Sequence, residues 1–343
     1  MSETSKAVAM RVVEADGFGL DRLCLVERPV PRPGPGEMLV RVGAATLNYR
    51  DLAILKGSYK PDLKPPFVPG SDACGEVVEA GPGVTRFKVG DRVVPTYTQG
   101  WIDGLPTPEQ RSSRTLGVPL SGVLQDYVAV PAEDAVAAPA HLSDVEAATL
   151  PIAALTAWST LQEGGAKPGD WVLVEGTGGV ALFALQFAKL AGARVLVLSS
   201  SEEKLARARE LGADATINYS EVPEWGAAAK AATGGRGADI VVETAGSTLP
   251  QALQAVAFGG FVGVIGFVGG YRAEVDIRQL IGPMVRVQGI AVGSRTRFEA
   301  MNRAIAAHGL RPVVDQILPL ERAVDAFALM ECGGHFGKIG VML

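Results

Sequence analysis

A glycine-rich turn between an apolar strand and an apolar helix carries the clearest chemical signal in the sequence. The strand Trp171–Glu175 is followed by Gly176-Thr177-Gly178-Gly179-Val180-Ala181, in the pattern G-x-G-x-x-A, and an apolar helix then runs to Gly192. The first glycine permits a tight turn, the second lets backbone approach a pyrophosphate, and the small third residue allows close helix–sheet packing. The helix N-terminus offers free N–H groups to the anion. We therefore predict a dinucleotide site, and the alternative is a glycine-rich turn without a ligand.

The end of the next strand bears on which dinucleotide would bind. Where NAD is bound, an Asp or Glu about 20 residues after the first glycine holds the ribose 2′-OH. Here Leu196–Ser201 (LVLSSS) has no acid, and Lys204 follows. Hydroxyls and a lysine suit a 2′-phosphate, so we expect NADPH in preference to NADH. Ser200 with Glu203 is also a capping box for the next helix, and Glu202 and Glu203 would repel a phosphate.

The elements around this turn indicate two kinds of fold along one chain. Up to about residue 130, short β-rich runs such as MLVRVGAA and CGEVVEAG are separated by turn residues, which is typical of a compact β unit. From Ser143, which forms a capping box with Glu146, helical segments alternate with apolar strands. Such alternation predicts a parallel sheet with helices on both faces. The last segment combines a helix around FEAMNRAIAAHG with a terminal strand, KIGVML.

The composition and charge of the chain limit the possible classes of protein and its possible cellular locations. The chain has 343 residues, 48% hydrophobic and 20% charged, with a formal net charge of -5. A net negative charge disfavours a nucleic-acid partner. The sequence has no apolar run near the roughly 20 residues that span a bilayer, and its N-terminus lacks the apolar stretch of a secretory signal. Its three cysteines, Cys24, Cys74 and Cys332, are widely spaced, so we expect a soluble, cytoplasmic protein with reduced thiols.

Several further motifs resemble one superfamily over nearly the whole chain. These are Pro69–Val78 (PGSDACGEVV), Gly81–Val84 (GPGV), Phe87–Val93 (FKVGDRV), Leu155–Trp158 (LTAW) and Gly337–Ile339 (GKI). Together they resemble the medium-chain dehydrogenase/reductase superfamily. The resemblance implies an α/β protein, with a GroES-like β-rich catalytic domain over 1–132 and 296–343. A Rossmann domain with a doubly wound parallel sheet would occupy 133–295, and the active site would lie between the two.

The chain departs from the zinc-dependent members of that superfamily at each ligand position. Those members carry Cys-His ahead of an Asp where this chain has Asn48-Tyr49-Arg50-Asp51, and Gly-His-Glu where it has Gly70-Ser71-Asp72. Their third ligand, a cysteine, corresponds to Ile152, and residues 95–120 lack the four cysteines of the structural zinc lobe. The three histidines, His141, His308 and His335, have no ligand spacing. We therefore expect no zinc; the alternative is a site built from Cys74 and distant residues.

The resemblance to the zinc-free, quinone oxidoreductase-like branch implies a reaction. We expect an NADPH-dependent oxidoreductase that reduces a quinone, an enone or an aldehyde or ketone by hydride transfer. The alternatives are an NAD(P)-dependent alcohol dehydrogenase acting oxidatively and a non-catalytic NADPH-binding protein. Tyr49 is the candidate proton donor, or else a pocket wall with water as the proton source. Asn48 is a candidate for binding the cofactor ribose or a substrate oxygen, and Asp51 either joins the catalysis or begins a helix.

Further cofactor contacts are implied position by position. Thr156 matches a family threonine that touches the nicotinamide. Tyr219 matches a family tyrosine that packs by the adenosine phosphate, near Lys204. The resemblance also implies Gly266, Phe267, Val268, Val292, Gly293, Ser294 and Lys338, whereas Ser199 and Ser200 follow from the strand end that lacks an acid. Lys338 would reach the cofactor phosphates, or is a solvated lysine near a strand. The strand VRVQGIAVG resembles the one through which family members dimerise, so we expect a homodimer. The expected reaction implies a small-molecule substrate.

Overall fold

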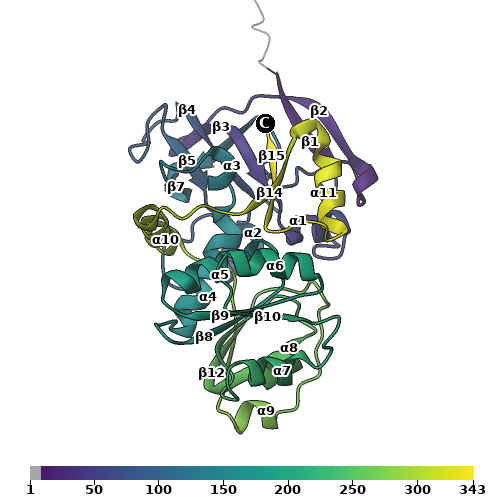
Figure 1. Cartoon of the computed structure of the whole chain (residues 1–343). Coiled ribbons are helices and arrows are strands. Elements are labelled where there is room, and N and C mark those ends of the chain that lie inside the picture. Colours follow the sequence, from purple (N-terminus) through teal and green to yellow (C-terminus); the bar gives the residue numbers. More distant parts are fainter. Residues whose placement is uncertain (1–8) are drawn as a thin grey trace, which may run out of the picture. The chain divides into compact units, whose positions relative to one another are not determined.

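The computed structural model describes residues 9–343; the first eight residues, where part of the signal-sequence expectation lies, are outside it. The chain forms two compact units, one extending to Ile152 and taken up again at Ser294–Leu343, the other comprising Ala153–Gly293 (Figure 1). The first boundary therefore lies after Ile152 rather than after residue 132. The reason is that β7 (Ala135–Ala137) pairs with β5 (Arg92–Pro95), which keeps this stretch in the first unit.

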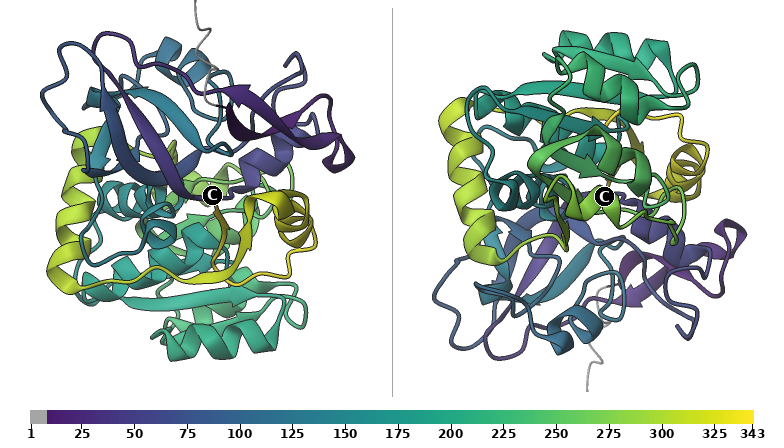
Figure 2. Two further views of the ribbon diagram at one scale, coloured as in Figure 1. Left: turned by 90° about the horizontal axis from the view of Figure 1, so that it is seen from above. Right: turned by 90° about the horizontal axis from the view of Figure 1, so that it is seen from below.

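The first unit is built on a mixed sheet of short strands. The strand order is β14-β15-β3-β4-β5-β7, with β6 paired to β3. The remaining bounds are β3 Glu37–Thr46, β4 Asp72–Ala80, β6 Tyr127–Pro131, β14 Val314–Pro319 and β15 Lys338–Met342. A separate antiparallel hairpin, β1 Ala9–Ala15 with β2 Leu23–Pro29, extends from this sheet (Figure 2). Buried side chains of β3, β4 and β6 form one core with those of the C-terminal helix, as the GroES-like expectation required.

Short helices surround this sheet and position the polar residues considered below. They are η1 Leu20–Arg22, α1 Tyr49–Leu55, α2 Pro108–Ser113, η2 Ala132–Asp134, α3 Asp144–Ala147, α10 Arg295–His308, η4 Leu320–Arg322 and α11 Ala323–Glu331. The capping box predicted at Ser143 and Glu146 is present at the start of α3. A π-helical turn, Leu150–Ala154, then leads to the helix that opens the second unit. No helix among residues 9–343 is long and apolar enough to cross a membrane.

The second unit is a six-stranded parallel sheet in the order β10-β9-β8-β11-β12-β13. Its strands are β8 Trp171–Glu175, β9 Arg194–Ser199, β10 Ala215–Asn218, β11 Ala238–Glu243, β12 Val256–Val264 and β13 Arg286–Gly289. Its helices are α4 Leu155–Gly164, α5 Gly179–Leu190, α6 Glu202–Glu210, α7 Trp225–Ala232, α8 Leu249–Ala255 and α9 Arg278–Ile281. Helices α5 and α6 cover one face and α7 and α8 the other (Figure 1), which confirms the doubly wound sheet.

The direction of winding reverses between β8 and β11. The chain moves outward from β8 through β9 to β10, crosses back to β11, and continues to β13. The carboxyl ends of β8 and β11 therefore meet at the topological switch point, where open α/β sheets bind their ligands. Both strands are almost wholly buried, which explains why they read as continuous apolar runs rather than alternating patterns.

Candidate active site

The glycine turn predicted from the sequence has the backbone that a phosphate site needs. Gly176 has φ +81°, a left-handed conformation that favours glycine, and its N–H donates to Leu198 O at 2.8 Å. A Cβ at Gly176 or Gly178 would meet no atom within 4 Å, so the space above the turn is open to a ligand. Helix α5 begins at Gly179, and Ala181 is buried against the sheet. The free N–H groups at the start of this helix therefore adjoin an open space.

Four residues expected near the adenosine lie together at the ends of β9 and β10. Ser199 is buried and pairs in register with Asn218, and the next amide, of Tyr219, donates to Ser199 O at 3.1 Å. Ser200 and Tyr219 are exposed. Lys204 lies in the first turn of α6. These residues surround the strand end at which the sequence lacks an acid.

The capping expectation at this strand end is wrong by one residue. Ser201, not Ser200, is the N-cap of α6, and its hydroxyl accepts from Lys204 N at 3.3 Å. The reason is that Ser201 is still extended, with φ −122° and ψ 121°, so the helix begins at Glu202. The Ser200 side chain is thus left out of the cap.

The loops expected at the nicotinamide end show tight backbone packing. A Cβ on Gly293 would lie 2.7 Å from Ser159 Oγ and 2.9 Å from Leu155 Cγ, so a larger residue would displace these side chains. Val292 has φ +66°, a conformation that is rare for a β-branched residue and is found where function or packing imposes it. Phe267 stacks on Tyr271 with ring centroids 4.9 Å apart. Thr156 is buried on α4, whereas Ser294 caps α10 in the first unit.

In the first unit, Lys338, Asn48 and Asp72 form a buried polar cluster. Lys338 Nζ donates to Leu47 O at 2.6 Å and to Asn48 Oδ1 at 2.7 Å, and lies 3.7 Å from Asp72 Oδ2. Asn48 Nδ2 in turn donates to Asp72 Oδ2 at 2.9 Å. Lys338 is only 3% exposed, so it is neither the solvated lysine nor the phosphate contact considered from the sequence. Its ammonium is instead occupied within the first unit, because β15 places it beside the residue preceding α1.

Burial perturbs the two ionisable members of this cluster. It raises the pKa of Asp72 to about 7, although Lys338 and the Asn48 hydrogen bond act in the opposite direction. Burial likewise lowers the pKa of Lys338, although Asp72 and Asp51 oppose the change. Burial therefore favours the neutral form of each group, compared with the same group in water.

A second cluster joins Arg50, Asp51 and Ser71. Ser71 Oγ donates to Asp51 Oδ1 at 2.5 Å, and Asn48 N donates to Asp51 Oδ2 at 3.0 Å. Arg50 Nη1 donates to Ser71 Oγ, to Asp51 Oδ1 at 3.1 Å and to Leu116 O at 3.1 Å. The Asp51 side chain has no exposed surface, so its carboxylate fixes the start of α1 and holds the guanidinium. The sequence suggested no role for Arg50, since its partners lie on separate segments.

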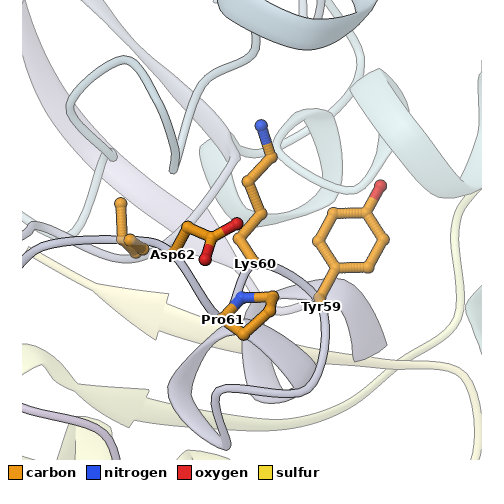
Figure 3. Close-up of a pocket in the computed structure, with 5 residues that line it drawn as sticks. Tyr59, Lys60, Pro61 and Asp62 are labelled. Atoms are coloured by element: carbon orange, nitrogen blue, oxygen red, sulfur yellow. The ribbon is translucent and has the colours of Figure 1, made fainter.

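Two tyrosine rings lie beside this guanidinium. The Arg50 Cζ atom lies 4.9 Å from the ring centre of Tyr97 and 5.7 Å from that of Tyr59. Tyr59 also begins the segment Tyr59–Leu63, which lines a hollow of about 390 Å³ (Figure 3). Tyr97 and Trp101 are buried. Trp101 Nε1 donates to Gly104 O at 2.9 Å, so this side chain anchors the loop that follows it.

Tyr49 differs from its neighbours in exposure. It lies in the first turn of α1, between Asn48 and Arg50, but 38% of its surface is exposed. Asn48 and Asp51 are, by contrast, enclosed by the hydrogen bonds described above. Of the three candidate catalytic residues, Tyr49 is thus the one whose hydroxyl-bearing side chain reaches the surface of its unit.

A third buried cluster was missed by sequence reasoning. Glu175, the last residue of β8, and Glu243, the last of β11, are side by side at the switch point and almost fully buried. Burial and the neighbouring Glu243 raise the pKa of Glu175 well above its ordinary value. The signal was present as one acid at the end of each apolar strand, WVLVE and DIVVE. Their pairing, however, depends on the strand order.

Metal ligands do not gather in the described part of the chain. Over residues 9–343, no group of three or more His, Cys, Asp and Glu side chains is arranged to hold a metal ion. The positions of the three family ligands carry an amide, a hydroxyl and a hydrocarbon, at Asn48, Ser71 and Ile152.

Models of two protein families match this chain. Residues 34–140 match the alcohol dehydrogenase GroES-like domain, and residues 179–307 match the zinc-binding dehydrogenase family. A zinc-type alcohol dehydrogenase-like protein, C1773.06c of Schizosaccharomyces pombe, is 43% identical over 97% of this chain and 99% of its own length.

Solved structures match over the same extent. One from Sinorhizobium meliloti 1021 has a TM-score of 0.92 and 44% identity, and covers 98% of this chain and 99% of its own. An NAD-dependent alcohol dehydrogenase has a TM-score of 0.88 and 35% identity, covering 97% and 99%. The 2-octenoyl-CoA carboxylase reductase CinF, solved with NADP and 2-octenoyl-CoA, has a TM-score of 0.85 and 27% identity, covering 97% and 87%.

Proposed function

The chain belongs to the medium-chain dehydrogenase/reductase superfamily of pyridine-nucleotide-dependent oxidoreductases, and within it we propose a zinc-independent reductase that uses NADPH. Its substrate would be a quinone, an enone, or an aldehyde or ketone. The bound nicotinamide would supply the hydride. The protein would hold the cofactor on the turn Gly176–Ala181, polarise the substrate oxygen and deliver a proton to it.

The zinc-free proposal is supported by hydrogen bonds that already occupy the side chains at two of the family's zinc-ligand positions. Asn48 is held between Lys338 and Asp72, and Ser71 is held between Arg50 and Asp51. Zinc requires thiolate, imidazole or carboxylate donors in a tetrahedral set. The residues present do not fit such a site, because a buried ammonium and a guanidinium already lie on these side chains, and either cation would repel a dication.

The preference for NADPH is supported by the end of β9. Ser200 is exposed there and lies outside the cap of α6, and Lys204 stands in the first turn of that helix. The repulsion expected from Glu202 is reduced because Arg209 Nη2 lies 2.8 Å from its Oε1. Among the similar structures one is named NAD-dependent and another was solved with NADP, so family membership alone leaves the choice open. The absent acid favours NADPH.

We assign the proton donation to Tyr49 and positioning roles to its neighbours. Tyr49 is exposed next to a helix start whose geometry is fixed by Asp51. Asn48 has both ends of its amide bonded, by Lys338 and Asp72, so it acts by holding the first turn of α1 rather than by binding the ribose. A phenol on a fixed helix turn is a suitable general acid.

A second candidate function is oxidation of an alcohol with NAD(P). It is supported by the similar proteins, several of which are named alcohol dehydrogenases. The open cofactor turn is compatible with either direction of the reaction and also with a purely NADPH-binding role. Substrate panels with reduced and oxidised cofactor distinguish these functions.

The direct experiment is to follow the absorbance of NADPH and of NADH with quinones, enones, aldehydes and ketones, and that of NADP and NAD with alcohols. Reduction of one carbonyl or enone class with NADPH supports the proposal. Turnover with alcohols and NAD, without carbonyl reduction, would replace it by the second candidate.

We further propose that the protein is a cytoplasmic homodimer joined through β13. This strand is the edge of the sheet and pairs with β12, and Val287 and the nearby Ile281 and Met284 are exposed. An unprotected apolar edge is suited to pairing with a second copy. Three free cysteines are compatible with a reducing compartment. Light scattering that gives the mass of a monomer would contradict the dimer.

A further inference from the structure

A single threonine hydroxyl stands between the two buried carboxyl groups of the second unit. Thr248 Oγ1 lies 2.8 Å from Glu243 Oε1 and 3.1 Å from Glu175 Oε2. A hydroxyl has one proton and can donate it to one of these oxygens only. The other short contact then requires a proton on a carboxyl group, because otherwise two lone pairs would face each other.

The other contacts of the four carboxyl oxygens also indicate that one of the two carboxyl groups is protonated. Glu243 Oε1 also accepts from Gly246 N at 2.6 Å and Ala245 N at 3.2 Å, and Glu175 Oε2 accepts from Thr244 N at 3.2 Å. Glu175 Oε1 and Glu243 Oε2 are buried and have no hydrogen-bond partner in the described structure. Two ionised carboxylates would leave both oxygens unsatisfied, next to each other's charge. One proton removes one of these two charges, and it supplies the donor that the Thr248 contacts lack.

We propose that Glu175 and Glu243 hold one proton between them, and that this acid–carboxylate pair positions the loop Thr244–Thr248 for cofactor binding. Both are positioning residues, and the inference rests on the cofactor site proposed above. Glu175 directly precedes Gly176 of the phosphate turn, so the pair connects that turn to the loop after β11.

The loop is in turn packed against the segment expected at the nicotinamide. Gly269 N donates to Ala245 O at 2.8 Å. A Cβ on Gly246, which has φ +79°, would lie 2.5 Å from Gly270 O and 3.3 Å from Phe267 Cα. Because the backbones are in direct contact, a displacement of Thr244–Thr248 shifts Gly266–Val268 as well.

The helices and strands that pack against β8 and β11 carry their charged residues away from Glu175 and Glu243. Helix α8, which packs on β11, carries none, and the acid of α4 is Glu163, at its C-terminal end. On α5, Lys189 is in the last turn, paired with Asp214 at 2.7 Å. Arg194 of β9 pairs in register with Trp171, at the opposite end of β8 from Glu175.

Strand β11 itself carries one more charge, at a distance from the pair. Asp239 is the second residue of β11, at the end of the strand opposite Glu243, and β12 carries no charged residue. Loss of the shared proton at alkaline pH therefore leaves two facing carboxylates without a nearby cation. The expected consequence is that the loop opens and the cofactor binds more weakly.

The test measures the Kd of NADPH between about pH 6 and 10 in the wild type and in Glu175→Gln. The amide is a permanent donor in place of the shared proton. We expect the wild-type Kd to rise by about tenfold toward alkaline pH beyond any rise in the variant, since each unit of pKa difference is a factor of ten. Glu210→Gln, at an exposed position of α6, is the matched control and should follow the wild type. Superimposable profiles for the wild type and Glu175→Gln would overturn the proposal.

A measurement without cofactor separates this inference from the proposed function. In urea unfolding, the midpoint of the wild type should fall further toward alkaline pH than that of Glu175→Gln, because Asp72 contributes the same change to both proteins. If NADPH does not bind at any pH, the cofactor proposal is wrong and the unfolding series still decides whether the proton is shared. Should Glu175→Gln not fold, Glu243→Gln takes its place, and an infrared carbonyl band of a protonated carboxyl in the wild type at neutral pH is expected; its absence would overturn the proposal.

Discussion

Lys338 Nζ lies 2.7 Å from Asn48 Oδ1, which connects the last strand of the chain to the residue that starts helix α1. In zinc-dependent members of the superfamily, the position of Asn48 holds a metal ligand. In this protein the same position is bonded to an ammonium and, through Nδ2, to Asp72. The Lys338 ammonium is therefore bonded to Asn48, the residue that directly precedes Tyr49, our proposed proton donor.

Replacing Lys338 by methionine should destabilise the protein by about 3 kcal/mol, because it leaves Asp72 buried without its cation and removes the donor to Leu47 O and Asn48 Oδ1. Urea unfolding measures the change. Lys230→Met, at an exposed position of α7, is the control and should shift stability by less than about 0.5 kcal/mol. A Lys338→Met protein as stable as that control would show that the cluster is not needed for the fold.

Asp72 gives the stability a defined pH dependence. Burial raises its pKa from 3.8 to about 7, so the folded state binds the proton more tightly than the unfolded chain does. The stabilisation this provides is full below about pH 4 and is lost as the pH rises through about 7. Asp72→Asn removes this component, so the difference in unfolding free energy between the wild type and the variant should drift with pH over that range. A difference independent of pH would contradict it.

An acid at the end of β9 should change the cofactor preference. Ser200→Asp places a carboxylate where the 2′-phosphate is expected, so the Kd of NADPH should rise by about 30-fold while that of NADH stays the same or falls. Ser113→Asp, at an exposed position of α2 in the first unit, adds the same charge and should leave both constants unchanged. Equal effects of Ser200→Asp on the two cofactors would show that Ser200 does not face the phosphate.

Removing the Tyr49 hydroxyl should slow the chemical step. We expect Tyr49→Phe to lower kcat by about 100-fold with the Kd of NADPH unchanged, since the loss of a general acid costs roughly that factor. Stopped-flow turnover together with cofactor fluorescence provides both values. An unchanged kcat would identify water as the proton source and Tyr49 as part of the pocket wall.

Features formed by neighbouring residues could be predicted, and those formed by distant segments could not. The turn Gly176–Ala181 and the capping box at Ser143 are local, and both are present as expected. Lys338 was misjudged because its surroundings depend on β15 pairing with β3, almost 300 residues earlier in the chain. The acids Glu175 and Glu243 come together only because the sheet reverses its winding between β8 and β11.

The first domain boundary shows the same dependence on distant pairing. The superfamily resemblance implied a boundary after residue 132, but β7 completes the sheet of the first unit by pairing with β5. A three-residue strand, Ala135–Ala137, has no sequence pattern of its own. Its place is set by a partner that lies about 40 residues earlier.

The most direct test of a zinc-independent NADPH reductase is turnover in the presence of a chelator. The protein is dialysed against a strong zinc chelator and assayed in it for NADPH oxidation with the best substrate of the panel. The account predicts an undiminished rate with NADPH, above that with NADH, because Asn48, Ser71 and Ile152 cannot hold the metal. Loss of the activity on dialysis, with recovery when zinc is added, would contradict it.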